Sequence, residues 1–107
     1  MTKQNTEPDY EDLSGKQVYI LRLFITGASP NSSRAIANLK AICETHLKGN
    51  YELEITDVYQ QPLIAQREQV IALPMLINMS PLPVRRLIGD MSDTEKVLRG
   101  LGLSSSN

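Results

Sequence analysis

The chain holds one cysteine and one histidine, which limits the chemistry that its side chains can perform. Cys43 has no second thiol with which to form an internal disulfide, and Cys43 and His46 are too few ligands to close a zinc site. Cys43 falls on the apolar stripe of a predicted helix, so we expect a buried side chain rather than a redox sensor. His46 has no obvious partner acid, and we expect it to interact with the helix dipole. We therefore predict no catalytic residue, no metal site and no cofactor.

Four arginines form the charged set best suited to contact another protein: Arg22, Arg34, Arg85 and Arg86. Arginine is favoured at interfaces because its guanidinium is weakly hydrated and presents a fork of donors. The alternative is that each is a solvated side chain or forms an internal ion pair with Asp57 or Asp90. Both interpretations remain open from the sequence.

Length and composition indicate one globular domain. The chain has 107 residues, with 41% hydrophobic and 21% charged residues. A net charge of −1 lacks the basic excess that nucleic-acid binding requires. The sequence has neither an apolar run of about 20 residues nor a signal peptide, so we expect a cytoplasmic protein without membrane contact. We predict a flexible N-terminal arm over residues 1–15, a domain over 16–103 and a polar tail over 104–107.

The first half of the domain shows clear local patterns. Residues 18–26 are almost continuously apolar, which predicts a central strand covered on both faces. A helix follows, with Ser29 as its N-cap, Pro30 at its first position and apolar residues at helical spacing as far as Leu47. Residues 51–58 alternate between apolar and polar, which is typical of a half-exposed strand near a sheet edge.

The second half gives conflicting signals. We predict a short helix over residues 62–69 and strands over 70–79 and 84–89, although Pro74 would break the ladder of the first strand. Ser92 and Glu95 fit a capping box at the start of a last helix. Gly100 and Gly102 then weaken that helix soon after it begins.

The predicted order β-α-β-α-β-β-α, with Pro74 before the third strand, resembles the thioredoxin-like α/β fold. The stretches GASPNSSRA (27–35), ITDVYQQP (55–62), ALPML (72–76) and PLPVRRLIGDMSDTEKVL (81–98) are similar to GNTPNSVRA, VIDVLKNP, ATPTL and PPPVRRIIGDLSDREKVL of the KaiB family of circadian clock proteins. The resemblance covers about residues 16–103 without gaps, and the PVRRLIGD block is its most specific part.

The resemblance implies a regulator without enzymatic activity. KaiB-family proteins bind the first ATPase ring of KaiC, a RecA-type hexamer, and in the full clock they then capture KaiA. They also switch between a homo-oligomeric ground-state fold, a dimer or tetramer here, and a thioredoxin-like form. If this chain is metamorphic in its second half, the residues that gate the switch are proline and glycine candidates: Pro74, Pro81, Pro83, Gly89, Gly100 and Gly102. Without the resemblance, a plain single-fold domain would be the simpler interpretation.

The resemblance also assigns partner-binding candidates. Arg34 matches the arginine of the family's NSVRA motif, and Arg85 and Arg86 match PVRR. On this fold we expect them to converge with Arg22 near one end of the sheet and to contact an acidic surface of KaiC. Tyr19 matches an aromatic residue of the family. It could line an interface or pack in the core, and the sequence favours neither role.

Two departures from the family pattern speak against KaiA capture. Glu52 and Glu54 replace a small residue and a lysine on the second strand, and the family's acidic C-terminal tail is replaced by residues 104–107. The prediction is therefore a KaiC-binding regulator without KaiA, in a timer or stress-adaptation system. Two alternatives remain, a KaiB-like sensory module that contacts a histidine kinase in trans and, with least support, a glutathione-dependent enzyme that uses Ser29.

Overall fold

The computed structural model describes residues 18–70 and 72–103. The predicted N-terminal arm over residues 1–15 and the polar tail over 104–107 lie outside the described residues. Seven elements follow one another in the order β-α-β-α-β-β-α, as predicted. They are β1 (Tyr19–Ile25), α1 (Pro30–His46), β2 (Tyr51–Asp57), α2 (Pro62–Arg67), β3 (Met75–Ser80), β4 (Arg85–Ile88) and α3 (Thr94–Gly100).

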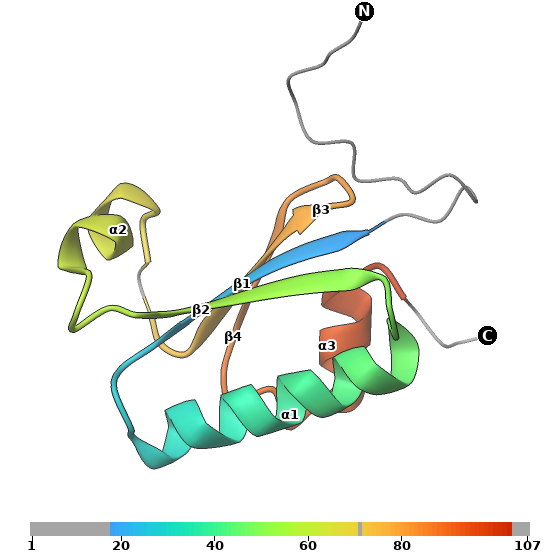
Figure 1. Ribbon diagram of the computed structural model, residues 1–107, viewed down its shortest axis with the longest axis horizontal. Helices are drawn as coiled ribbons and strands as arrows, with labels where there is room; N and C mark the ends of the chain where they lie inside the picture. Colours follow the sequence, from blue (N-terminus) through green and yellow to red (C-terminus); the bar gives the residue numbers. More distant parts are fainter. Residues whose placement is uncertain (1–17, 71, 104–107) are drawn as a thin grey trace, which may run out of the picture.

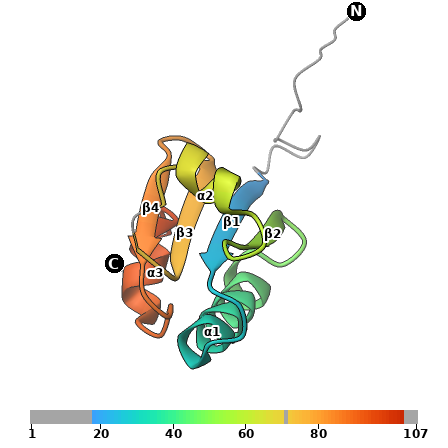
Figure 2. The ribbon, with the colours of Figure 1, turned by 90° about the vertical axis from the view of Figure 1, so that its left-hand side faces the viewer.

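The four strands form one sheet in the order β2-β1-β3-β4. β1 pairs in parallel with β2, with Leu21 opposite Leu53, and antiparallel with β3, with Leu23 opposite Leu76. β4 pairs antiparallel with β3 and forms the second edge of the sheet. Figure 2 shows β1, β3 and β4 side by side. Two predictions are thus confirmed: the strand over residues 18–26 is central, and the strand over 51–58 lies at an edge.

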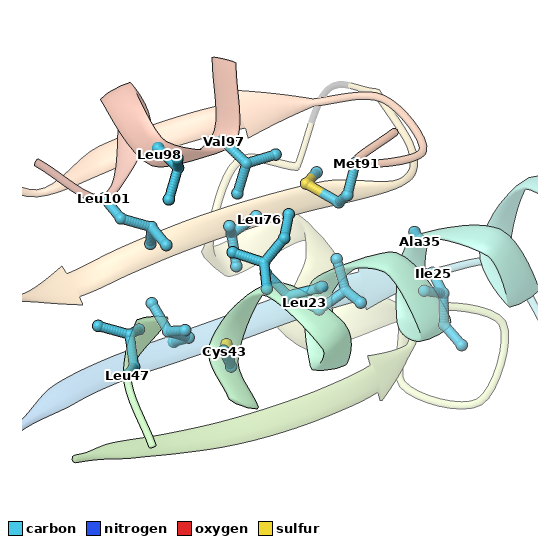
Figure 3. Close-up of a cluster of buried hydrophobic side chains, with 13 residues drawn as sticks. Leu23, Ile25, Ala35, Cys43, Leu47, Leu76, Met91, Val97, Leu98 and Leu101 are labelled. Carbon is cyan, nitrogen blue, oxygen red and sulfur yellow. The ribbon is translucent and has the colours of Figure 1, made fainter. Parts of the chain in front are cut away.

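The face of the sheet that carries α1 and α3 holds the larger core (Figure 1). Leu21, Leu23 and Ile25 alternate along β1 and point to this face, as a period of two residues requires. Figure 3 shows Ala35 and Cys43 of α1 in this cluster with Leu47 just after that helix, and Val97 and Leu98 of α3 with Leu101 just after it. This apolar layer joins the two halves of the chain.

The start of α1 follows from its sequence. Ser29 is the N-cap, because its side-chain Oγ accepts a hydrogen bond from the Ser32 backbone N–H at 3.1 Å. Pro30 occupies the first helical position, where no backbone donor is needed. Both predictions at this helix end are confirmed.

The opposite face of the sheet carries a smaller apolar cluster. Phe24 of β1 is fully buried beside Met75 and Ile77 of β3. Ile64 of α2 packs against this group, so α2 covers part of the face that α1 and α3 leave open. The arginines of interest lie around these two layers.

The second half folds as predicted in outline, with one correction at its last helix. β3 begins only after Pro74, which removes the conflict between that proline and the strand ladder. The N-cap of α3 is Asp93, not Ser92, because the Asp93 side-chain oxygen accepts the Lys96 backbone N–H at 3.1 Å. Ser92 instead donates its own backbone N–H to the Asp90 carboxylate. Asp93 is as good an N-cap residue as Ser92, and its bond to the Lys96 N–H makes the helix begin one residue later than predicted.

Leucine-to-alanine substitutions at a buried and an exposed position will test this packing. We expect Leu39→Ala to lower the free energy of unfolding by about 3 kcal/mol, because Leu39 is fully buried in α1 and its loss leaves a cavity. The matched control is Leu63→Ala in α2, which removes a leucine that is 69% exposed and is expected to cost under about 1 kcal/mol. Urea unfolding measures both; equal losses would contradict the burial pattern.

Candidate docking surface

Arg22 is an internal residue of the fold and not an exposed docking residue. Its guanidinium Nη1 donates to Glu68 Oε2 at 2.9 Å, and its Nε lies 3.4 Å from Glu54 Oε1. The guanidinium also lies 5.2 Å from the centroid of the Phe24 ring. Its side chain is only 18% exposed. Arg22 therefore joins β1 to the edge strand β2 and to the residues that follow α2.

Arg34 lies at the end of the sheet where α1 begins. It donates from Nε to Asp90 Oδ2 at 3.3 Å and from Nη2 to the side chain of Asn31. Hydrogen bonds from Ser92, together with the Arg34 guanidinium, hold the pKa of the Asp90 carboxyl below its usual range. Asn38 donates to the Asp90 backbone carbonyl at 2.9 Å and adds a second link. Arg34 thus connects α1 to the β4–α3 loop while its side chain stays 56% exposed.

Arg85 and Arg86 are adjacent on β4 and point to opposite faces of the sheet. Arg85 Nη1 donates to the Arg99 backbone carbonyl at 2.8 Å, on the face that carries α3. Arg86 Nη1 lies 3.4 Å from the Gln69 backbone carbonyl on the other face. Both residues are exposed. Within residues 18–70 and 72–103, neither guanidinium is paired with a carboxylate.

The four arginines do not converge at one end of the sheet, so that prediction is wrong. Arg22 is held on the α2 face, Arg34 lies beside the β4–α3 loop, and Arg85 and Arg86 lie along the β4 edge. The antiparallel course of β4 separates the last two from Arg34, because the start of β4 lies at the opposite end of the sheet from the start of α1. The sequence left open an internal ion pair with Asp57 or Asp90, and Arg34 forms such a pair with Asp90.

Tyr19 packs against the larger core at the start of β1 and is half-buried. Burial raises the pKa of its phenol above the ordinary value. The structure shows the core packing that the sequence allowed for Tyr19, and a role of its exposed part at an interface stays a prediction.

The loop before α1 shares an open groove with Leu73 and Pro74. Its hydroxyl groups bond to one another and to the backbone: Ser29 Oγ lies 2.8 Å from Ser32 Oγ, which accepts the Thr26 N–H at 3.0 Å. Asp57 accepts the Gly27 N–H at 3.1 Å from the neighbouring strand end. The hydroxyls and the carboxylate at this end of the sheet thus serve to hold the loop.

Cys43 lies far from that loop, in the middle of the larger core. Its side chain is fully buried, and burial raises the pKa of the thiol to about 12, with a smaller contribution from the Glu44 carboxylate. The expected burial of this cysteine is confirmed. His46 is the last residue of α1 and is exposed.

The proline and glycine candidates cluster around β3, β4 and α3. The peptide bonds before Pro74, Pro81 and Pro83 are all cis, at the start of β3 and in the β3–β4 connection. Gly89 and Gly102 have positive φ angles of 128° and 76°, which L-residues with side chains rarely adopt. Gly100 is different: a Cβ there would lie 2.3 Å from Leu87 Cδ1, so α3 packs on β4 through bare backbone.

The exposed side of β4 is the most plausible docking surface that the geometry offers. It combines the two arginines with apolar side chains at both ends, Val84 at 48% and Ile88 at 43% exposure. Leu82, in the loop before it, is 79% exposed. We call this group, Leu82, Val84, Arg85, Arg86 and Ile88, the β4 edge. It is a basic and apolar surface, suited to an acidic partner.

Comparison with known proteins identifies the family. The KaiB domain family model matches residues 22–103. The chain belongs to the KaiB family. It is 47% identical over 91 residues to the circadian clock oscillator protein KaiB of Prochlorococcus marinus (strain MIT 9515), covering 85% of this chain and 84% of that protein.

Solved structures place this KaiB-family chain in the thioredoxin-like fold. The N-terminal domain of Synechococcus elongatus SasA aligns with a TM-score of 0.67 at 19% identity, covering 98% of this chain and 99% of that chain. The germline-specific thioredoxin Deadhead of Drosophila melanogaster aligns with a TM-score of 0.64 at 13% identity over 79% of both chains. Both likenesses concern the fold alone. Among the described residues, no helix is long and apolar enough to cross a membrane.

One structural residue escaped the sequence analysis. Glu68, which follows α2, is the closest partner of Arg22, although 46 positions separate them. An arginine inside an otherwise apolar strand signals that some acid must accompany it, but the sequence offers no means of choosing among the acids of the chain.

The Arg22 ion pairs can be weighed by double-mutant cycles. We expect Arg22→Met and Glu68→Gln to couple by about 1 kcal/mol in urea unfolding, because the pair is 2.9 Å long and largely shielded from solvent. The control cycle, Arg22→Met with Glu54→Gln, is expected to couple by under about 0.5 kcal/mol, since the Glu54 side chain is 67% exposed. A larger coupling free energy with Glu54 than with Glu68 would show that Arg22 is held mainly by β2 and not by the residues that follow α2.

Cys43 predicts a specific loss of stability at alkaline pH. Because its folded-state pKa of about 12 lies above the ordinary value of 9.0, the unfolded chain deprotonates first as the pH rises. The buried thiol therefore favours folding below about pH 9, and this contribution is lost between about pH 9 and pH 12. Wild type is expected to lose about 2–3 kcal/mol more than Cys43→Ala between about pH 8 and pH 11. Parallel stability curves for the two proteins would contradict a buried thiol.

Proposed function

We propose that this chain is a non-enzymatic, KaiB-like clock regulator that binds the ATPase ring of a KaiC-type hexamer through the β4 edge. The observation that carries the proposal is a KaiB-family chain whose two adjacent β4 arginines lack carboxylate partners in the described residues. The relatives at this level of identity are circadian clock oscillator proteins. A timer or stress-adaptation system is the setting that we propose.

The composition of the β4 edge supports docking. Arg85 and Arg86 keep donors available, since in the described part of the chain each guanidinium engages a backbone carbonyl and, for Arg86, the Met75 sulfur at 3.9 Å. Adjacent apolar side chains, Val84 and Ile88, would exclude water around an arginine–carboxylate contact. Charged pairs gain strength when surrounding contacts exclude solvent in this way.

The residues at the start of α1 support a role without thiol chemistry. In thioredoxin-like enzymes a cysteine at this helix start is the nucleophile. Here residues 28–31 contain none, and the one thiol of the chain is fully buried 12 residues beyond Asn31. Ser29 already bonds to Ser32 as the helix cap.

The acidic character of the β2 edge supports a regulator that works without KaiA. Glu52 and Glu54 are both exposed on this strand, and their charge is opposite to that of the lysine usual in the family. We propose that a surface of this sign does not capture KaiA. A basic partner of another kind would fit it better.

We also propose that the chain exchanges between the thioredoxin-like form and a homo-oligomeric ground-state fold, a dimer or tetramer. The support is local: β4 has only four residues and α3 only seven, joined through positive-φ residues at Gly89 and Met91. In a metamorphic protein the two packings of one sequence differ by only a few kcal/mol, and short elements could be rearranged within such a difference. Solution NMR of the whole chain tests this proposal, because the signals of residues 84–103 show whether this part of the chain ends in a helix or in a strand.

Binding to the cognate KaiC-type hexamer tests the main proposal. In the presence of ATP, the chain is expected to co-elute with the hexamer, and Arg85→Ala with Arg86→Ala is expected to weaken the complex by about tenfold or more. The matched control is Lys40→Ala with Lys48→Ala, which removes two positive charges from exposed positions around α1. The control is expected to bind within about threefold of wild type.

The contrary outcomes are distinct. If both double variants weaken binding equally, the effect comes from the loss of net positive charge, and the β4 edge is not the specific binding surface. Failure of the wild type to bind any KaiC-type ring would reject the proposal, and binding to a histidine kinase instead would favour the sensory-module alternative.

A further inference from the structure

We propose that Asn78 is a destabilising residue in the core, which favours the local release of β4 and α3 from the rest of the molecule. Asn78 lies in β3 and is 2% exposed, so its side-chain amide is enclosed by the fold. The release takes place within the thioredoxin-like form. Only its link to an exchange between two folds rests on the proposed function.

The buried amide of Asn78 has an unused acceptor. Its Oδ1 is shielded from solvent, and in the part of the chain that the structure describes it has no hydrogen-bond donor. Ser32 is a contrasting buried polar residue, because its Oγ accepts the Thr26 N–H at 3.0 Å. A buried acceptor without a donor lowers the folding equilibrium constant by about tenfold or more. Asn78 therefore weakens the fold at the place where it lies.

That place is the larger core. Side chains alternate along β3, with Leu76 in the larger core and Ile77 in the smaller one, so Asn78 shares the face of Leu76. In the ladder Asn78 pairs with Leu21 of β1, which also belongs to the larger core. The amide thus lies in the apolar layer between the sheet and the two helices α1 and α3. This is the layer that joins the two halves of the chain.

Arg85 lies opposite Asn78 on β4, but α3 holds its guanidinium elsewhere. Side chains of directly opposite residues begin about 5 Å apart, which is within reach of an arginine. Arg85 Nη1 donates instead to the Arg99 carbonyl at 2.8 Å, near the end of α3. When α3 leaves the sheet, Arg85 loses this acceptor and becomes free to donate to Asn78 Oδ1, which water then also reaches. The open state therefore satisfies the amide that the closed state leaves unpaired.

The ladder between β1 and β3 is irregular beside Asn78. Leu21 pairs with Asn78, whereas Ile20 pairs with Ser80 and not with Met79, so the register shifts by one residue. A shift of this kind disrupts the ladder locally. The first residue of β4 pairs with Asn78, so the irregular end of β3 is the end where β4 begins. The unpaired amide and the irregular ladder thus weaken the same part of the second half.

Urea unfolding and amide hydrogen exchange of the full chain test the proposal in two variants, Asn78→Leu and Asn78→Val. Leucine keeps the branching of asparagine, and the smaller valine guards against overfilling the core. At least one variant is expected to lower the equilibrium constant of unfolding by about tenfold, because an apolar group replaces an unpaired polar one.

The exchange measurement locates the effect. The Leu101 and Leu103 amides bond to carbonyls of α3, and their exchange is expected to slow by about tenfold in the stabilised variant. The Glu68 amide, which bonds to the Ile64 carbonyl in α2, is the internal control. Its exchange is expected to stay unchanged, because α2 covers the other face of the sheet and opens without exposing Asn78.

Ser32→Ala is the matched control, because it also removes a buried polar group but leaves the Thr26 N–H without its acceptor. It is expected to raise the equilibrium constant of unfolding by about tenfold, in the opposite direction to the Asn78 variants.

A raised unfolding constant in both Asn78 variants would overturn the proposal, because Asn78 Oδ1 would then be hydrogen-bonded in the folded chain. Stabilisation without slower exchange at Leu101 and Leu103 would also reject it, because α3 would then open without exposing Asn78. Neither measurement requires a KaiC-type ring or a second fold, so failure of the proposed function would produce neither of these contrary results.

Discussion

The antiparallel pairing of β3 with β1 is the contact on which the second half of the molecule depends. It places Leu76 opposite Leu23 in the larger core and Met75 opposite Phe24 in the smaller one. Within residues 18–70 and 72–103, β3 is the one strand that pairs with β4, so the place of β4 in the sheet depends on β3. The position of Arg85 and Arg86 at an exposed edge is therefore a consequence of how β3 joins a sheet that β1, α1 and β2 begin.

The same pairing separates Arg22, which is built into the fold, from Arg85 and Arg86, which lie at the exposed β4 edge. Arg22 faces Ile77 across the β1–β3 ladder and is enclosed by Glu54 and Glu68. Arg86 pairs with Ile77 from the other side of β3 and lies at the edge of the sheet, where its guanidinium meets, among the described residues, the Gln69 carbonyl and the Met75 sulfur. Residues of one type thus take different roles according to their distance from the sheet edge. This arrangement supports the proposed docking role of the β4 edge, while the thiol of Cys43 is enclosed in the core.

The sequence predicted the elements well because each half-buried strand and helix carries its own pattern. The alternation over residues 51–58 and the Ser29-Pro30 start of α1 are local signals, and both are confirmed. The arginine arrangement was predicted wrongly because it depends on the direction of β4 and on the ion pair between Arg22 and Glu68, which join distant positions. The α3 cap was displaced by one residue because Ser92 and Asp93 are both good caps. The alternative fold that we propose for the second half would depend on small free-energy differences, which no local pattern reveals.

Site-specific photo-crosslinking to a KaiC-type hexamer tests the central claim most directly, because it asks which edge of the sheet meets the partner. A crosslinker at Val84, which is 48% exposed beside the two arginines, is predicted to join the chain to the ring. A crosslinker at Tyr59, which is 77% exposed just beyond β2, is predicted to give little or no product. Crosslinking from Tyr59 but not from Val84 would contradict docking through the β4 edge.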